Sequence, residues 1–502
     1  MITPAQGQAV LPNVRVQANL MRRMMPEPSA TALPGTTSTT AGGLEPDAIG
    51  VAQDTIIGMA SSAPAAVVAI SLAALAAASA YGGGPVLLIS AVPMLIIANA
   101  YRRLNMWNAN AGASFEWVGR AINPYLGFLT GWLMIVGFVV GTLSGVVILG
   151  PSVLAVFTNS AASTWPNVLI ATAVGVVMTV IAVVGIRITA RVQVVMAVVE
   201  YAILVGMSVW GLFYVLGHHP GTYHITSGWF SLSGVGGQGS IVAGFLIAVF
   251  AYSGWDGSIY VNEEVRHRHA NPGRAAIIAV ALLAVIYTVA QVGLQGVISP
   301  KNLQASAAPL VSVAQALGGG DWAKVMALAI ALSAIATTGA GIVVGARIIY
   351  GMASYRALPG FLANVNRRFA TPAAASVVFG VAVVALGWVY LLATSVQNAF
   401  NDVVDITGLV FALFYVLTAL AAVVYYRRRV FSGVWDAVIL GIAPVASAGF
   451  LVWMVVKYLT TAPAAQNWSV AGILISGVVM MLVARFWLRS PFFQVRPESD
   501  PG

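Results

Sequence analysis

The sequence predicts an all-α polytopic membrane protein with twelve transmembrane helices, and three observations carry that prediction. Of the 502 residues, 59% are hydrophobic and 8% are charged, whereas soluble domains carry about 25% charged residues. Twelve apolar segments are long enough to cross a bilayer, which takes about 20 residues in a helix. The period-2 alternation of a membrane β-barrel is missing. A helical bundle is therefore the expected architecture.

The twelve predicted helices are separated by short polar loops. They cover residues 48–79, 84–103, 124–154, 166–187, 191–217, 239–262, 274–298, 322–354, 373–394, 403–425, 435–459 and 468–488. The polar, Pro/Thr/Gly-rich stretch 1–47 before them is expected to be a disordered tail, because it has too little apolar content to form a core.

Basic residues are sorted between the two sides of this predicted bundle. The arginines lie in the N-terminal tail, at helix ends or in the even-numbered loops, and the lysines Lys301, Lys324 and Lys457 belong to the opposite side. The positive-inside rule then places both termini in the cytoplasm. The protein is expected to be a multi-pass protein of the plasma membrane. The formal net charge of +9 is a topology signal, and no nucleic-acid partner is expected.

Composition and motifs argue against an enzyme or a cofactor protein. The chain has no cysteine, all five histidines fall in predicted loops, and neither an HExxH motif nor a P-loop occurs. The "GWDG" string resembles part of an aspartyl membrane protease, but a second aspartate in a matching context is missing. No catalytic residue, metal or cofactor is expected.

The first predicted helix is interrupted at its centre. Its sequence, "IGVAQDTIIGMASSAPAAVVAIS", contains Pro64, which lacks an N–H and clashes with the preceding turn. Unpaired backbone at membrane depth is tolerated where it lines a cavity or meets a ligand. The residues expected to contribute to a binding site here are Gly58, Met59, Ala60, Ser61, Ser62 and Ala63.

The sixth predicted helix is interrupted in the same way, in the sequence "VFAYSGWDGSIYVNEE". An aspartate at the centre of a membrane helix costs roughly 2.5–3.5 kcal/mol on insertion scales, so Asp256 indicates function. Interrupted helices five positions apart indicate an inverted repeat with a substrate site between the halves. The residues expected to bind substrate here are Tyr252, Ser253, Gly254, Trp255, Asp256 and Gly257.

This spacing divides the chain into predicted parts. They are a cytoplasmic tail at 1–47, a first five-helix repeat at 48–217, a second at 218–425, two peripheral helices at 426–489 and a second cytoplasmic tail at 490–502.

Three stretches resemble the amino acid–polyamine–organocation superfamily. "FAYSGWDGSIYVNEEVRHRHANPGRAAI" is similar to its sixth helix and the following loop, "NANAGASFEWVGRAINPYLGFLTGW" to the start of its third helix, and "GARIIYGMASYRALP" to the end of its eighth. The resemblance covers roughly residues 45–425 and implies the five-plus-five inverted-repeat fold of the bacterial leucine transporter. It also implies that the protein is a permease.

The chain departs from that family pattern at two places. The Gly-x-Gly whose N–H groups take a substrate carboxylate is absent from the first helix. Where proton-coupled relatives place a lysine in the fifth helix, this chain has Glu200.

Four residues are candidates for binding a coupling ion: Glu200, Asp256, Thr337 and Thr338. Glu200 and Asp256 would carry a proton, whereas the threonines would bind Na⁺, as hydroxyls of the eighth helix do in sodium-coupled relatives. Two alternatives stay open. In the first, Glu200 packs against neighbouring helices and has no coupling role. In the second, the threonine hydroxyls bond to their own helix and bind no ion.

Three further carboxylates lie near the predicted cytoplasmic ends of helices. Asp54 is expected to be an interfacial carboxylate, a gate or the partner of an arginine. Glu263 and Glu264 are expected to form salt bridges with the arginines at 266, 268 and 274.

Together these features predict a secondary transporter for amino acids or related amines that works by alternating access, with H⁺ or Na⁺ as the coupling ion. Buried acids without buried bases indicate an amine-bearing substrate. The alternative is a cation or proton channel, or the pump subunit of a membrane complex.

Overall fold

The computed structural model describes residues 43–158, 163–232, 237–393, 396–462 and 464–501. Almost all of the predicted disordered tail, residues 1–42, therefore lies outside the described residues. Within them, eleven helical segments are long and apolar enough to span a membrane. Each of the eleven matches one predicted helix. The sixth predicted helix has no match, because each of its two halves is too short to span a membrane alone.

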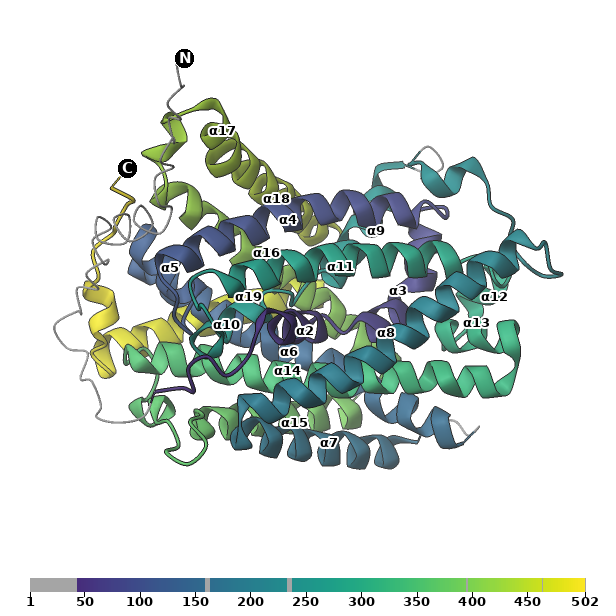
Figure 1. The fold of residues 1–502 in the computed structure, drawn as a ribbon, viewed down its shortest axis with the longest axis horizontal. Coiled ribbons are helices and arrows are strands. Elements are labelled where there is room, and N and C mark those ends of the chain that lie inside the picture. The colour runs from purple at the N-terminus through teal and green to yellow at the C-terminus, as the bar shows by residue number, and fades with distance from the viewer. Residues whose placement is uncertain (1–42, 159–162, 233–236, 394–395, 463, 502) are drawn as a thin grey trace, which may run out of the picture. The chain divides into compact units, whose positions relative to one another are not determined.

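Among the described residues, the first half of the chain forms seven α-helices and one 3₁₀ turn, which can be followed in Figure 1. They are α2 (Val51–Ser61), α3 (Pro64–Ala78), α4 (Gly83–Trp107), α5 (Ser114–Ala121), α6 (Pro124–Phe157), α7 (Thr164–Val184), α8 (Ile186–Leu216) and the 3₁₀ turn η1 (Ser227–Phe230).

The second half begins with another broken helix. Its elements are α9 (Gly237–Ala251), α10 (Gly257–Tyr260), η2 (Asn262–Glu264), α11 (Asn271–Leu294), α12 (Pro300–Ala305), α13 (Pro309–Gly318), α14 (Gly320–Ser354), η3 (Gly360–Ala363), α15 (Ala373–Ala393) and α16 (Val396–Tyr425).

The last part of the chain adds two further spans. Its elements are η4 (Arg429–Phe431), α17 (Val434–Asp436), the π-helical turn η5 (Ala437–Ile442), α18 (Ala443–Thr461), α19 (Ala464–Leu482), the π-helical turn η6 (Val483–Trp487) and η7 (Pro491–Gln494).

The two predicted breaks are present and touch each other. Ala63 adopts a left-handed conformation between α2 and α3, with φ of 47°, and Pro64 begins α3. Gly254 has φ of 102° between α9 and α10. A Cβ atom at Gly254 would lie 2.5 Å from the Ser61 carbonyl oxygen, so glycine permits both the backbone conformation and the close approach.

Long unbroken helices surround the breaks. In Figure 1, α2 lies near the centre of the view, and it packs against α8, α11 and α14. Helix α14 also packs against α6, and α11 against α4. The breaks are therefore enclosed by protein, as irregular backbone at membrane depth requires.

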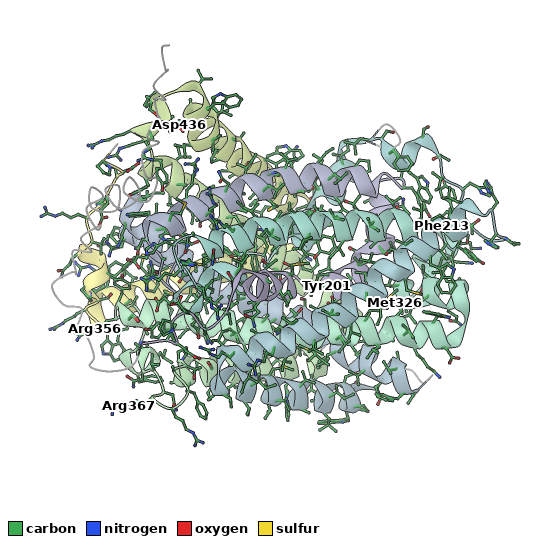
Figure 2. All side chains as sticks on the ribbon, in the orientation of Figure 1. Tyr201, Phe213, Met326, Arg356, Arg367 and Asp436 are labelled. Carbon is green, nitrogen blue, oxygen red and sulfur yellow. The ribbon has the colours of Figure 1, made fainter. Side chains whose placement is uncertain are left out.

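The charged side chains lie mainly toward the helix ends. Figure 2 shows Arg356 and Arg367 at one end of the helices, Phe213 at the other, and Tyr201 close to the middle. Tyr201 follows Glu200 in α8, so Glu200 lies near the middle of the membrane-spanning region.

One predicted ion-pair arrangement at the arginine-rich end is wrong. Glu264 pairs with Arg347 of α14, through two bonds of 2.9 Å each, and both side chains are fully buried. The sequence instead predicts Arg347 near a helix end and Glu264 paired with the loop arginines at 266, 268 and 274. The fold brings the buried carboxylate of Glu264 to the buried guanidinium of Arg347, and the loop arginines stay outside this contact.

The carbonyl of Glu264 also fixes the start of α2. It accepts hydrogen bonds from the N–H groups of Ala48 and Ile49, at 2.8 and 3.2 Å. Glu264 therefore ties three elements together at the predicted cytoplasmic end: η2, α14 and the segment that leads into α2.

The segment after α19 docks onto the same end of the protein. Phe492 is fully buried and stacks on Phe115 of α5, with ring centroids 4.0 Å apart. Glu498 and Asp500 form ion pairs with Arg120 and Arg429, at 2.9 and 2.5 Å. The sequence predicted a tail here and did not predict this docking.

Candidate substrate and coupling site at the two helix breaks

The first predicted cluster, from Gly58 to Ala63, lies against the second break. A Cβ at Gly58 would lie 2.7 Å from the Trp255 carbonyl oxygen, and one at Gly257 would lie 2.6 Å from Ser61 Oγ. Small residues on both sides thus allow the backbones of the two breaks to approach closely.

The other members of this cluster are held by neighbouring helices or by their own. Met59 and Ala60 are buried, and Ala60 packs with Met196 of α8 and with Ala336 and Ala340 of α14. Ser62 is also buried, and its carbonyl accepts a hydrogen bond of 3.1 Å from the Tyr287 hydroxyl of α11.

Asp256 lies in the second break and has a tyrosine at each carboxyl oxygen. Tyr260 donates to Oδ2 and Tyr415 of α16 donates to Oδ1, both at 2.7 Å. The Tyr415 hydroxyl in turn accepts from the N–H of Gly254, at 3.2 Å. Asp256 therefore organises the break through this network, and both of its oxygens are engaged in this conformation.

The aromatic residues of the second break pack inward. Trp255 is fully buried and stacks on Tyr415, with ring centroids 5.3 Å apart. Tyr252 is also buried, and its hydroxyl donates to the Leu87 carbonyl of α4 at 3.1 Å. The Ser253 hydroxyl donates to the Val249 carbonyl of α9 at 3.0 Å.

Glu200 reaches the first break from α8. Its Oε1 accepts a hydrogen bond of 2.9 Å from the N–H of Ala65 in the first turn of α3. The next N–H, that of Ala66, donates to Ser333 Oγ of α14 at 3.2 Å. A carboxylate at a helix N-terminus is stabilised by the unpaired N–H groups and by the helix dipole. Glu200 of α8 and Ser333 of α14 thus both bind the start of α3.

The two candidate threonines differ in their contacts. Thr337 donates to the Ala60 carbonyl at the end of α2 and to the Ser333 carbonyl, at 2.8 and 2.9 Å. Thr338 donates to the Ala334 carbonyl of its own helix. The structure therefore joins Thr337 to the first break, whereas Thr338 bonds within α14.

Asp54 lies two turns before the break and is fully buried. Neither of its carboxyl oxygens has a hydrogen-bond partner among the described residues. Among the described residues no arginine pairs with Asp54, and packing of α2 against its neighbours covers its carboxyl group.

Sequence reasoning missed the tyrosines that hold the second break. Tyr260 follows Asp256 by one helical turn, and this i, i+4 spacing could have indicated the contact. Tyr415 carries no such signal, because it lies 159 residues further along the chain. The role of Tyr287 at the first break was missed for the same reason.

A bundle of apolar helices with two touching interruptions near mid-span is the architecture of secondary transporters. The comparisons with known proteins agree. The sequence profile described as "Amino acid permease" matches residues 54–481. The chain therefore belongs to the amino acid permease family, and its eleven apolar helical spans among the described residues support a multi-pass membrane protein.

Individual relatives match a smaller part of the chain. The chain is 32% identical over 134 residues to the large neutral amino acids transporter small subunit 2 of Oryctolagus cuniculus. It is also 32% identical over 134 residues to the Asc-type amino acid transporter 1 of Mus musculus. Each match covers 27% of this chain and 25% of the relative.

Among solved structures, MhsT in complex with L-phenylalanine shares the fold. The TM-score is 0.56 at 16% identity, over 82% of this chain and 100% of MhsT. The fold is thus the leucine-transporter type that the sequence predicted.

Proposed function

We propose that the protein is a secondary active transporter that moves amino acids or related amines across the plasma membrane by alternating access, coupled to protons through Glu200. The observation that carries this proposal is the junction of the two breaks. Ser61 and Gly254 are in close approach there, Glu200 bonds to one break and Asp256 lies in the other.

The charge around the junction favours a positively charged substrate group. The carbonyl ends of α2 and α9 both face the breaks, and a helix C-terminus carries partial negative charge. Asp256 adds a carboxyl group between Tyr260 and Tyr415. A substrate ammonium near these groups, and near the rings of Trp255 or Tyr252, would be attracted by carbonyl oxygens, carboxyl group and aromatic faces together.

The contacts of Glu200 suit a coupling role. A proton on this carboxyl group would weaken its bond to Ala65, because a charge-assisted hydrogen bond is about twice as strong as a neutral one. Protonation would therefore loosen the tie between α8 and the break in α2–α3. Na⁺ bound near Thr337 and the Ala60 carbonyl is the alternative coupling ion.

The test is uptake into proteoliposomes containing the purified protein, with a pH gradient or a sodium gradient imposed separately. We expect the pH gradient to drive accumulation of amine substrates. Glu200→Gln should abolish this accumulation and leave substrate exchange largely intact, since exchange needs no net proton movement. If a sodium gradient drives uptake by the wild type and Thr337→Ala abolishes that uptake, the coupling role belongs to Thr337 and not to Glu200.

A further inference from the structure

We propose that the site selects amines that lack a carboxylate, and that Glu200 is the specificity-determining residue because it occupies the position where a substrate carboxylate would bind. This inference rests on the proposed transport function and narrows its substrate class. The hydrogen-bond donors and positive charges at the two breaks carry this inference.

The first turn of α3 is the natural anion site at the junction, and its donors are all in use. A helix N-terminus leaves its first N–H groups without partners inside the helix. Here Ala63 donates to the Ala60 carbonyl at 3.1 Å, and Pro64 has no N–H. Ala65 donates to Glu200, and Ala66 donates to Ser333.

The second break offers a substrate carboxylate a buried side-chain donor, the indole N–H of Trp255, which has no hydrogen-bond partner among the described residues. The backbone donors there add little. The N–H of Gly254 donates to the Tyr415 hydroxyl, and that of Gly257 donates to the Gly254 carbonyl at 2.9 Å. Helix α10 has four residues, too few to add an appreciable dipole at its N-terminus.

No unpaired positive side chain replaces these donors. Among the described residues, Arg347 is the one fully buried cationic side chain, and Glu264 binds it through both carboxylate oxygens. An amino acid in this site would therefore bury its carboxylate close to the carboxyl groups of Glu200 and Asp256, with no positive side chain and few free donors, the Trp255 indole N–H among them. An unpaired buried charge is strongly disfavoured. The matching amine keeps the favourable ammonium contacts and avoids this cost.

The experiment compares ligands that differ only by the α-carboxylate: cadaverine with lysine, agmatine with arginine, and phenethylamine with phenylalanine. Equilibrium binding to the purified protein is measured for each pair, with counterflow in proteoliposomes for the ligands that bind. We expect each amine that fits the site to bind at least about tenfold more tightly than its amino acid.

Equal or tighter binding of the amino acids would overturn this inference and leave the proposed transport function standing. If none of the six ligands binds or is exchanged, the proposed amine and amino acid specificity itself fails. The two failures are therefore distinguishable.

Variants of Glu200 test its role in selectivity. Glu200→Ala releases the Ala65 N–H, so the amine-to-amino-acid preference should fall by about tenfold. Glu200→Gln keeps an acceptor oxygen at this N–H and should retain more of the preference. The matched control is Ser208→Ala in the same helix, because Ser208 is buried and its hydroxyl donates to the Leu204 carbonyl of that helix.

An unchanged preference in folded Glu200→Ala would show that Glu200 does not set selectivity. If Glu200→Ala fails to fold, Ser333→Ala releases the adjacent Ala66 N–H and should shift the preference in the same direction. An unchanged preference in that variant would overturn the assignment equally.

Discussion

At the scale of single residues, the buried ion pair between Glu264 and Arg347 is expected to contribute strongly to the stability of the folded protein. Removing one partner leaves the other charge buried without compensation, which costs about 3–5 kcal/mol. We therefore expect Arg347→Ala and Glu264→Gln each to lower the thermal stability of the purified protein markedly, as measured by a fluorescence melting curve.

The control for this pair lies at the other end of α14. Lys324 and Asp321 are solvent-facing and 3.9 Å apart, so Lys324→Ala should leave the melting curve almost unchanged. A double variant in which Met and Leu replace Arg347 and Glu264 should be more stable than either single variant, because neither charge is left unpaired. A melting temperature for Arg347→Ala equal to the wild-type value would contradict the predicted cost.

At the scale of elements, the docked segment η7 should stabilise the predicted cytoplasmic end. Phe492 fills a space against Phe115 and above Gly119, where a Cβ would lie 2.4 Å from the ring. Replacing a buried Phe by Ala removes buried apolar surface and leaves a cavity, and together these lower the free energy of unfolding by about 3–5 kcal/mol. We expect Phe492→Ala to release residues 490–501, so that limited proteolysis cleaves this segment faster.

Gly119→Ala should have a similar effect, since its added methyl group displaces the Phe492 ring. Phe431→Ala is the matched control, because Phe431 is exposed and lies at the end of η4, before α17. Equal cleavage rates in Phe492→Ala and wild type would mean that the ion pairs of Glu498 and Asp500 suffice to hold the segment.

At the scale of the whole molecule, the sorting of basic residues predicts the orientation in the membrane. The chain has no cysteine, so single cysteines can be introduced on a clean background at four exposed positions. In intact cells, an impermeant thiol reagent should label His219→Cys and Lys301→Cys. Labelling of Arg367→Cys or Arg428→Cys before permeabilisation would reverse the predicted orientation.

A second prediction for the whole molecule separates a transporter from the channel alternative. Alternating access requires that uptake saturate with substrate concentration and that preloaded substrate accelerate the entry of labelled substrate. We expect both effects in proteoliposomes. Uptake that rises linearly with concentration, together with single-channel currents in planar bilayers, would favour the channel.

The sequence by itself determined the helical class, the positions of the spans and the two breaks. These features depend on properties local to the chain: apolar runs of sufficient length, Pro64, and glycines such as Gly254 that permit backbone conformations other residues disfavour. The short helices α5, α12 and α13 escaped prediction, since they lie in loops and lack the length that makes a membrane span recognisable.

Only the tertiary structure decided which side chains meet. Glu200 and Ala65 are 135 residues apart, Asp256 and Tyr415 are 159 apart, and Glu264 and Arg347 are 83 apart. No local periodicity encodes such pairs. They form because packing of α2, α8, α14 and α16 removes these polar groups from water, and a buried polar group must then find its partner within the protein.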